Sequence, residues 1–311
     1  MRALRAWLLL LPGVLACSSS EAALLGDLPL ENGQILRDCR ITYRTRGTLN
    51  ADKSNAVLVI PWFQGTSTET ALQVGPGKFV DTSRFFAILV DTPGNGLASS
   101  PSNSTAQPGA AFPSFTMRDV VVAHYRLVTE TFGIRHLHAV LGVSMGGMQV
   151  FEWVVAYPDF MTKAVSIVGS PQTQPDDVER WNGAVRWLGH SRWTRSRSRL
   201  SDLKPRAALS ELGVEPDDQL RQIHAMVGHD VARQFEGSLE RAAAAVKAEL
   251  LVVSTWADGE VNPRPAFEFA RLARAEVLEL NGRCGHQAPS CERATLWPAV
   301  GRFLDRARST P

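Results

Sequence analysis

Residues 137–151 read LHAVLGVSMGGMQVF, and their pattern changes from strand to helix at a single serine. The first six residues form a compact apolar run of the kind found in buried strands, and the apolar residues after Met145 recur at helical spacing. Between them, Gly142-Val143-Ser144-Met145-Gly146 forms G-x-S-x-G, a motif that places a serine on a sharp strand-to-helix turn. This stretch therefore predicts a strand, a tight turn that exposes Ser144, and a helix.

Short apolar runs alternate with longer amphipathic stretches on both sides of this segment. Apolar residues at three- and four-residue spacings predict helices at 117–132, 145–157 and 264–274. This alternation is typical of an α/β fold, with a mainly parallel sheet flanked by helices. Buried strands are predicted at residues 57–60, 85–90, 137–142, 164–168 and 250–254, and a further strand is predicted at 276–280.

The composition excludes several classes of protein. The chain has 311 residues, 44% of them hydrophobic, which suits a large core and not a disordered polymer. Its 33 Lys and Arg nearly balance its 31 Asp and Glu, so no strong overall field would attract nucleic acid or an anionic membrane. No Cys and His cluster has the spacing of a zinc site, and no glycine-rich phosphate loop follows the first predicted strand. We therefore expect no nucleic-acid partner, no metal and no cofactor.

The amino terminus has the pattern of an export signal. Two arginines precede an apolar run, residues 6–16, that is too short to span a bilayer as a mature helix. Val14-Leu15-Ala16-Cys17 resembles a bacterial lipobox, in which residues 1–16 are the signal peptide and Cys17 becomes the lipidated first residue. The alternative is cleavage near Ala22 and Ala23, which releases a soluble protein. Both alternatives predict an exported protein in the periplasm or cell envelope.

Export also changes the meaning of the cysteines, because an oxidising compartment permits disulfides that the cytosol would reduce. Cys284 and Cys291 are close enough in the chain to be the predicted pair, provided that their sulfurs face each other. Cys39 is then left unpaired. The alternative is that all three are small buried apolar residues without a disulfide.

Strand-like runs disappear between Ser170 and Arg206, where three tryptophans alternate with many arginines. Such a mixture can bind nucleic acid by stacking and charge. It also occurs in the helical caps of enzymes, where the aromatic residues are buried and the arginines are solvated, and we favour this interpretation. We therefore predict a core formed by residues 24–170 and 244–311, interrupted by a short helical cap insertion at 171–243.

A nucleophilic Ser144 needs a base, and a serine on such a turn is followed in the chain by Asp or Glu and then by His. Only His286 lies beyond the last predicted strand, in a glycine-bearing loop suited to presenting an imidazole. Asp258 follows the strand at 250–254 and is the predicted acid, with Glu260 as the alternative. The competing interpretations are a loop histidine with a purely structural hydrogen bond and an exposed surface aspartate.

A serine nucleophile also needs backbone amides that bind the oxyanion of the tetrahedral intermediate. The first predicted amide is that of Met145, the residue after the nucleophile. The second is that of Phe63, in the turn after the strand at 57–60. Trp62 and Phe63 also suit packing, which does not conflict with a role for the Phe63 amide.

Several segments together resemble the homoserine O-acetyltransferase family of the α/β-hydrolase superfamily. The resemblance covers about residues 28–170 and 245–305, and the serine motif is its most specific part. The family implies the α/β-hydrolase fold, a covalent acyl-serine intermediate and a helical cap, with Asp258 and His286 at its remaining triad positions. The similar segments are residues 43–50, 62–66, Phe112-Pro113, 116–119, 142–149, Glu152-Trp153, Tyr157-Pro158 and Gly285-His286.

The chain departs from the transferases of this family at three places. Pro61 stands where they usually have a histidine, and Gln287 stands where they have an aspartate. Their Gly-Arg-x-Asp segment, whose arginine helps to hold the amino-acid acceptor, has no counterpart here. Export fits poorly with acetyl-CoA as a substrate, because acetyl-CoA is a cytosolic metabolite. We therefore expect a serine-dependent acyl hydrolase of the esterase type, acting on a small-molecule acyl ester.

Two other functions stay open at this point. An O-acyltransferase would form the same acyl-serine and pass the acyl group to an alcohol instead of water. A binding or scaffold protein would keep the fold without catalysis, which the complete set of Ser144, Asp258 and His286 disfavours. The oligomeric state is also open, a homodimer included, and contact with a membrane is expected only through a lipid on Cys17.

Overall fold

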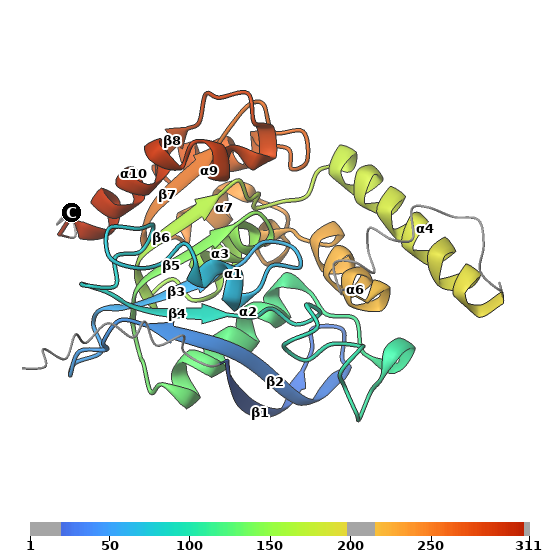
Figure 1. The fold of residues 1–311 in the computed structure, drawn as a ribbon. Helices are drawn as coiled ribbons and strands as arrows, with labels where there is room; N and C mark the ends of the chain where they lie inside the picture. The colour runs from blue at the N-terminus through green and yellow to red at the C-terminus, as the bar shows by residue number, and fades with distance from the viewer. Residues whose placement is uncertain (1–19, 198–214, 308–311) are drawn as a thin grey trace, which may run out of the picture.

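The computed structural model describes residues 20–197 and 215–307, so Cys17 and the predicted signal peptide lie outside the described residues. Eight strands form one sheet in the order β1-β2-β4-β3-β5-β6-β7-β8 (Figure 1). The β1–β2 and β2–β4 pairs are antiparallel, and the other five pairs are parallel. The strands are β1 (Glu21–Pro29), β2 (Ile35–Arg46), β3 (Ala56–Ile60), β4 (Phe86–Val90), β5 (Leu137–Val143), β6 (Met161–Ile167), β7 (Glu249–Ser254) and β8 (Glu276–Glu279).

Helices cover both faces of the sheet, which explains the continuous apolar runs of its central strands. All residues of β3 and β4 are buried. Leu58 and Ile60 of β3 pack in the core beneath α2, α3 and α8, whereas Val57 and Val59 face the core beneath α10. The α-helices are α1 (Ser67–Ala71), α2 (Met117–Arg126), α3 (Met145–Ala156), α4 (Pro175–Arg197), α6 (Pro216–Val227), α7 (Leu239–Ala244), α8 (Arg264–Leu272), α9 (Ala288–Cys291) and α10 (Arg293–Asp305), and the short helical turns are η1 (Gly109–Ala111), η2 (Leu127–Thr131), η3 (Val231–Phe235) and η4 (Gly285–Gln287).

The predicted α/β class with a mainly parallel sheet is confirmed, and the six predicted strands are present with shifts of a few residues at their ends. The sequence pattern did not predict β1 and β2. These two strands lie at one edge of the sheet and are antiparallel, and their exposed and buried residues are mixed. They therefore lack the compact apolar runs by which buried parallel strands were recognised.

The predicted helix at 117–132 is also interrupted. The α-helical part, α2, ends at Arg126, and one π-helical turn, η2, follows it. The hydroxyl of Thr129 donates a hydrogen bond to the carbonyl oxygen of Tyr125 at 2.8 Å, which competes with regular α-helical bonding at this position.

Between β6 and β7 the chain leaves the sheet and forms α4 and α6, which pack against each other. Figure 1 shows α4 extending away from the rest of the molecule beyond its first turns. The following η3 and α7 pack instead against α3 and α8, in the helical layer of the core. Within residues 20–197 and 215–307, no helix is long and apolar enough to cross a membrane.

The strand order brings three loops to one edge of the sheet. β4 and β5 lie on opposite sides of β3, so the connections change direction there, and such switch points form crevices at the carboxyl ends of parallel strands. The loops after β3, β5 and β7 carry Phe63, Ser144 and Asp258, respectively. The topology therefore gathers these residues although they are far apart in sequence.

His124 and His229 are buried in this fold. His124 of α2 places Nε2 3.4 Å from the carbonyl oxygen of Asp91, and His229 places Nε2 3.1 Å from that of Ser170. Burial lowers the pKa of both imidazoles from 6.5 to about 4, because the interior disfavours the charged form more than the carbonyl contacts favour it.

We expect the free energy of unfolding to fall as the pH is lowered from 6.5 to about 4. Above this range both histidines are neutral in the folded and unfolded chain. Within it the unfolded chain binds protons that the folded chain does not, so each histidine contributes a loss of about 1.4 kcal/mol per pH unit. Below pH 4 the folded chain is protonated as well, and the contribution levels off.

Urea unfolding of the wild type, His124→Gln and His229→Gln at several pH values measures this effect. Each substitution should make the decline between pH 6.5 and 4 shallower, because it removes one of the two groups. An equally steep decline in both variants would contradict the assignment.

Candidate active site

Ser144 lies on the turn between β5 and α3, with φ +56° and ψ −116°. Non-glycine residues rarely adopt this conformation, and it costs free energy that the surroundings must offset. The turn is possible because its glycines let main-chain segments approach closely. A Cβ atom on Gly142 would lie 2.1 Å from the carbonyl oxygen of Gly146, and one on Gly146 would lie 2.5 Å from that of Ile60.

The structure brings the three predicted side chains together at the carboxyl edge of the sheet. The Oγ atom of Ser144 lies 2.8 Å from Nε2 of His286, and Nδ1 of His286 lies 2.7 Å from Oδ2 of Asp258. The side chain of Asp258 is only 1% exposed. This geometry fits a neutral imidazole that carries its proton on Nδ1 and accepts the serine proton at Nε2.

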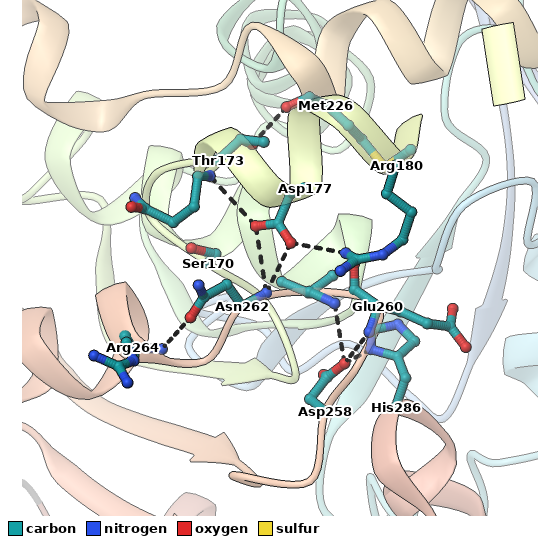
Figure 2. Close-up of polar contacts among 12 residues, drawn as sticks. Ser170, Thr173, Asp177, Arg180, Met226, Asp258, Glu260, Asn262, Arg264 and His286 are labelled. Carbon is teal, nitrogen blue, oxygen red and sulfur yellow. Dashed lines mark hydrogen bonds and ion pairs between the residues drawn. The ribbon is translucent and has the colours of Figure 1, made fainter. Parts of the chain in front are cut away.

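The acid in contact with the imidazole is Asp258 and not Glu260 (Figure 2). The backbone N–H groups of Glu260 and Val261 donate to Oδ1 of Asp258 at 2.9 and 3.0 Å. Glu260 therefore contributes its amide, which leaves Oδ2 of Asp258 directed at His286.

The two predicted oxyanion amides also lie at this edge. Met145 is the first residue of α3, so its N–H has no acceptor within the helix. Phe63 lies in the turn that is closed by a 2.9 Å hydrogen bond from the Gly65 N–H to the carbonyl oxygen of Trp62. Neither the Met145 nor the Phe63 N–H donates a hydrogen bond to another residue in the described part of the chain. The Met145 amide is at the positive end of α3, where an anion binds favourably, and Phe63 lines the same cavity as Ser144.

Gln222 of α6 holds the turn that carries Phe63, and no sequence pattern predicted it. Its Oε1 accepts hydrogen bonds from the backbone N–H of Gln64 at 2.9 Å and from the Gln64 side-chain amide at 2.8 Å. Its Nε2 donates to the carbonyl oxygen of Pro93 at 3.0 Å. Gln64 has φ +58°, a conformation that these contacts stabilise. No local motif marks Gln222, because Gln64 is 158 positions away.

A cavity of about 380 Å³ lies above Ser144 and His286. Trp181 of α4 contributes to its wall, so the cap forms part of the site. Aromatic and aliphatic side chains make up much of the lining, which suits a small, mostly apolar ligand with a few polar contacts. The apolar lining residues are Trp62, Phe63, Phe79, Val143, Trp181, Pro289, Leu296 and Trp297, and the polar ones besides Ser144 and His286 are Gln73, Glu260, Gln287, Ser290 and Arg293.

Among the described residues, no group of three or more His, Cys, Asp and Glu side chains is arranged to hold a metal ion. The disulfide predicted from the sequence is present between Cys284 and Cys291, whose Cα atoms are 6.5 Å apart. It encloses the segment that carries His286. Cys39 is a free, buried thiol, and burial raises its pKa to about 12.

The chain is similar to known ester hydrolases. The family described as alpha/beta hydrolase fold matches residues 72–204. A probable esterase of Corynebacterium glutamicum is 42% identical over 161 residues, and the ethyl acetate hydrolase of Pseudomonas veronii is 43% identical over 157 residues. These matches cover 50% and 49% of this chain and 46% and 44% of the two relatives, so the chain matches about half the length of each.

A similarity to homoserine acyltransferases extends over most of the chain. The homoserine O-acetyltransferase of Geotalea daltonii is 30% identical over 353 aligned positions, which cover 90% of this chain and 95% of that protein. The chain belongs to the homoserine O-acetyltransferase-like family of α/β hydrolases. The solved structure of an acetylester hydrolase from Corynebacterium glutamicum superposes on 93% of this chain and 96% of its own, with a TM-score of 0.80 and 27% identity. The predicted α/β-hydrolase fold and family resemblance are therefore confirmed.

Reduction of the disulfide should slow the reaction of Ser144 with a fluorophosphonate probe. The Cys284–Cys291 bond restrains the segment that carries His286, and a catalytic base that is displaced by a fraction of an ångström activates its serine poorly. We expect the labelling rate of the reduced protein and of the double variant Cys284→Ser/Cys291→Ser to be about tenfold lower.

Labelling followed by intact mass measures this rate. Cys39→Ser serves as the control, since the buried Cys39 forms no disulfide. Equal labelling rates for the oxidised protein and the double variant would show that the disulfide does not position His286.

Proposed function

We propose that the protein is a serine-dependent carboxylic ester hydrolase that acts on a small-molecule acyl ester. The observation that carries this proposal is the continuous chain of hydrogen bonds from Ser144 through His286 to Asp258, next to two unpaired backbone amides. A serine, a base, an oriented acid and oxyanion donors in one cavity are the parts that acyl transfer through a covalent intermediate requires.

In the first half of the reaction, Oγ of Ser144 attacks the ester carbonyl carbon while Nε2 of His286 takes up the serine proton. The N–H groups of Phe63 and Met145 bind the negative oxygen of the tetrahedral intermediate. His286 then gives its proton to the oxygen of the departing alcohol, and an acyl-serine remains. Asp258 stays ionised and stabilises the imidazolium.

In the second half, water attacks the carbonyl carbon of the acyl-serine, and His286 accepts a proton from that water. The tetrahedral intermediate collapses, the carboxylic acid leaves, and His286 returns the proton to Ser144. The reaction needs no group beyond these side chains and amides.

Three observations favour water over another acceptor. In matches of similar length, the identity to the two esterases is 42% and 43%, compared with 37% to the homoserine O-acetyltransferase of Pelobacter propionicus. Gln287 lines the cavity beside His286, and it is neutral where the transferases of the family usually have an aspartate. Pro61 stands where those transferases usually have a histidine, and it lies at the start of the turn that carries Phe63.

A second candidate is an O-acyltransferase that passes the acyl group from Ser144 to an alcohol. It is favoured by the similarity to the homoserine O-acetyltransferase of Geotalea daltonii, because that match covers 95% of the transferase. The two candidates share every step up to the acyl-serine and differ only in the molecule that accepts the acyl group.

Hydrolysis of a chromogenic short-chain ester by the wild type and by Ser144→Ala separates these functions. We expect the variant to lose at least about 1000-fold in kcat, because the nucleophile is removed. The wild type should release free acid at a rate that added homoserine does not change. Acceleration by homoserine, with formation of its O-acyl product, would support the transferase instead, and alcohol release that survives in Ser144→Ala would contradict both.

We also propose that the protein is exported and held at the cell envelope by a lipid on Cys17. The arginines and apolar run before Cys17 support this location, as does a disulfide of the kind that oxidising compartments permit. β1 begins at Glu21, whose carboxylate accepts a hydrogen bond from the hydroxyl of Tyr43 at 3.1 Å. Cleavage before Cys17 keeps this strand whole, whereas cleavage near Ala22 and Ala23 would remove its first paired residues.

In a bacterial host, wild-type protein should therefore sediment with the membranes, and Cys17→Ala should move to the soluble fraction or stay with an uncleaved signal. Ser18→Ala, which keeps the cysteine, is the matched control. Intact mass of the purified membrane form identifies the lipid. A soluble wild-type protein whose amino terminus lies near Ala23 would contradict lipidation.

A further inference from the structure

The first turn of the cap helix α4 contacts the turn that carries Asp258 (Figure 2). The side chain of Asp177 is 2% exposed, and its two oxygens lie 3.1 and 3.3 Å from the backbone nitrogen of Asn262. Nη1 of Arg180 donates to Oδ1 of Asp177 at 2.9 Å and to the carbonyl oxygen of Glu260 at 2.7 Å. Two side chains of the cap thus hold main-chain atoms that closely follow Asp258 in the chain.

Three successive amides of this turn are bound by carboxylates. Those of Glu260 and Val261 donate to Asp258 itself, and that of Asn262 donates to Asp177. The bonds from the Glu260 and Val261 amides set the direction of the Asp258 carboxylate. The bond from the Asn262 amide holds the main chain that carries those two amides. Asp177 therefore holds this turn from outside, together with the bond from Arg180 to the carbonyl oxygen of Glu260.

The base of α4 is itself held in place. The hydroxyl of Thr173 donates to the carbonyl oxygen of Met226 at 2.6 Å, and its N–H donates to the carbonyl oxygen of His229 at 3.0 Å. His229 in turn contacts the carbonyl oxygen of Ser170 at 3.1 Å. These bonds join the start of α4 to the end of α6, so the position of Asp177 is set by the packing of the cap (Figure 2).

Helix capping alone does not explain Asp177. The backbone N–H of Gln174 lies 3.3 Å from Oδ2, one of the longest contacts of Asp177, whereas the 3.1 Å bond to Asn262 joins residues 85 positions apart. Burial of a carboxylate is costly unless hydrogen bonds and an opposite charge compensate it. Here both compensating groups, the Asn262 amide and Arg180, connect Asp177 to the turn after Asp258.

We propose that Asp177 is a positioning residue for ester hydrolysis, which acts through the backbone amide of Asn262 and through Arg180 to hold Asp258 against His286. This inference rests on the proposed function, because it takes Asp258 as the acid that orients the base. It assigns a role in the chemistry to the cap, in addition to the wall that Trp181 contributes to the cavity.

Steady-state hydrolysis by Asp177→Ala, Asp177→Asn and Arg180→Ala tests the proposal. We expect Asp177→Ala to lower kcat about 10- to 100-fold with KM changed less than about threefold, since misplacement of a catalytic group acts on the chemical step. Asp177→Asn keeps an oxygen for the Asn262 amide and should recover most of the rate. Arg180→Ala, whose side chain is 43% exposed, should lower kcat about threefold to tenfold and provides a folded variant if Asp177→Ala does not fold.

Asp176→Ala is the matched control, since it removes the same charge from the same turn of α4 at an exposed position. It should retain the wild-type kcat. The double variant Asp177→Ala/Asp258→Asn distinguishes a positioning role of Asp177 from general damage to the cap. In the Asp258→Asn background Asp177→Ala should change kcat less than about twofold, because the acid through which it acts is already lost.

Equal kcat values for Asp176→Ala, Arg180→Ala and folded Asp177→Ala would overturn the proposal. So would a loss caused by Asp177→Ala that is as large in the Asp258→Asn background as in the wild type. Ser144→Ala is measured in parallel. If it retains activity, the proposed function fails and the positioning role fails with it, whereas a loss only in Ser144→Ala overturns the positioning role alone.

Discussion

Close main-chain contact at the first turn of α3 is the constraint on which the rest of the site depends. Gly146 packs against the carbonyl oxygens of Ile60 and Pro61, and Gly147 packs against Gly169 after β6. A Cβ atom on Gly169 would lie 2.4 Å from the main chain of Gly147. These contacts join the ends of β3, β5 and β6. The turn that carries Phe63, Ser144 itself and the segment that leads from β6 into the cap are therefore held in fixed positions relative to one another.

The cap acts on this framework from two sides. Through Gln222, α6 holds the turn that carries the Phe63 amide, and through Asp177, α4 contacts the turn that carries Asp258. Both contacts join a buried polar side chain of the cap to a backbone amide of the core, and a buried amide is costly to leave without an acceptor. The two helices are therefore bound to the catalytic loops, and Trp181 of α4 also contributes to the wall of the cavity of about 380 Å³.

Membership of one family is compatible with both hydrolysis and transfer, because the acyl-serine is common to both. In the proposed mechanism, the chemistry up to that intermediate depends on Ser144, His286 and Asp258, which lie in hydrogen-bond contact here. The fate of the acyl group would then depend on which acceptor the cavity holds beside it. Gln287 and the cap residue Trp181 lie in this cavity, so acceptor choice depends on side chains that can change while the triad stays the same.

The sequence by itself determined the buried strands, the serine turn and the order of Ser144, Asp258 and His286 along the chain. These features produce local patterns in the sequence. A continuous apolar run indicates a strand that is buried on both faces, and the glycines around Ser144 indicate that main-chain segments approach closely there. Only the tertiary structure decided that Asp258 and not Glu260 faces the imidazole, that β1 and β2 complete the sheet, and that Gln222 and Asp177 hold the catalytic loops. These features depend on single hydrogen bonds between residues far apart in the chain, or on edge strands without a compact apolar run, and neither produces a periodic pattern in the sequence.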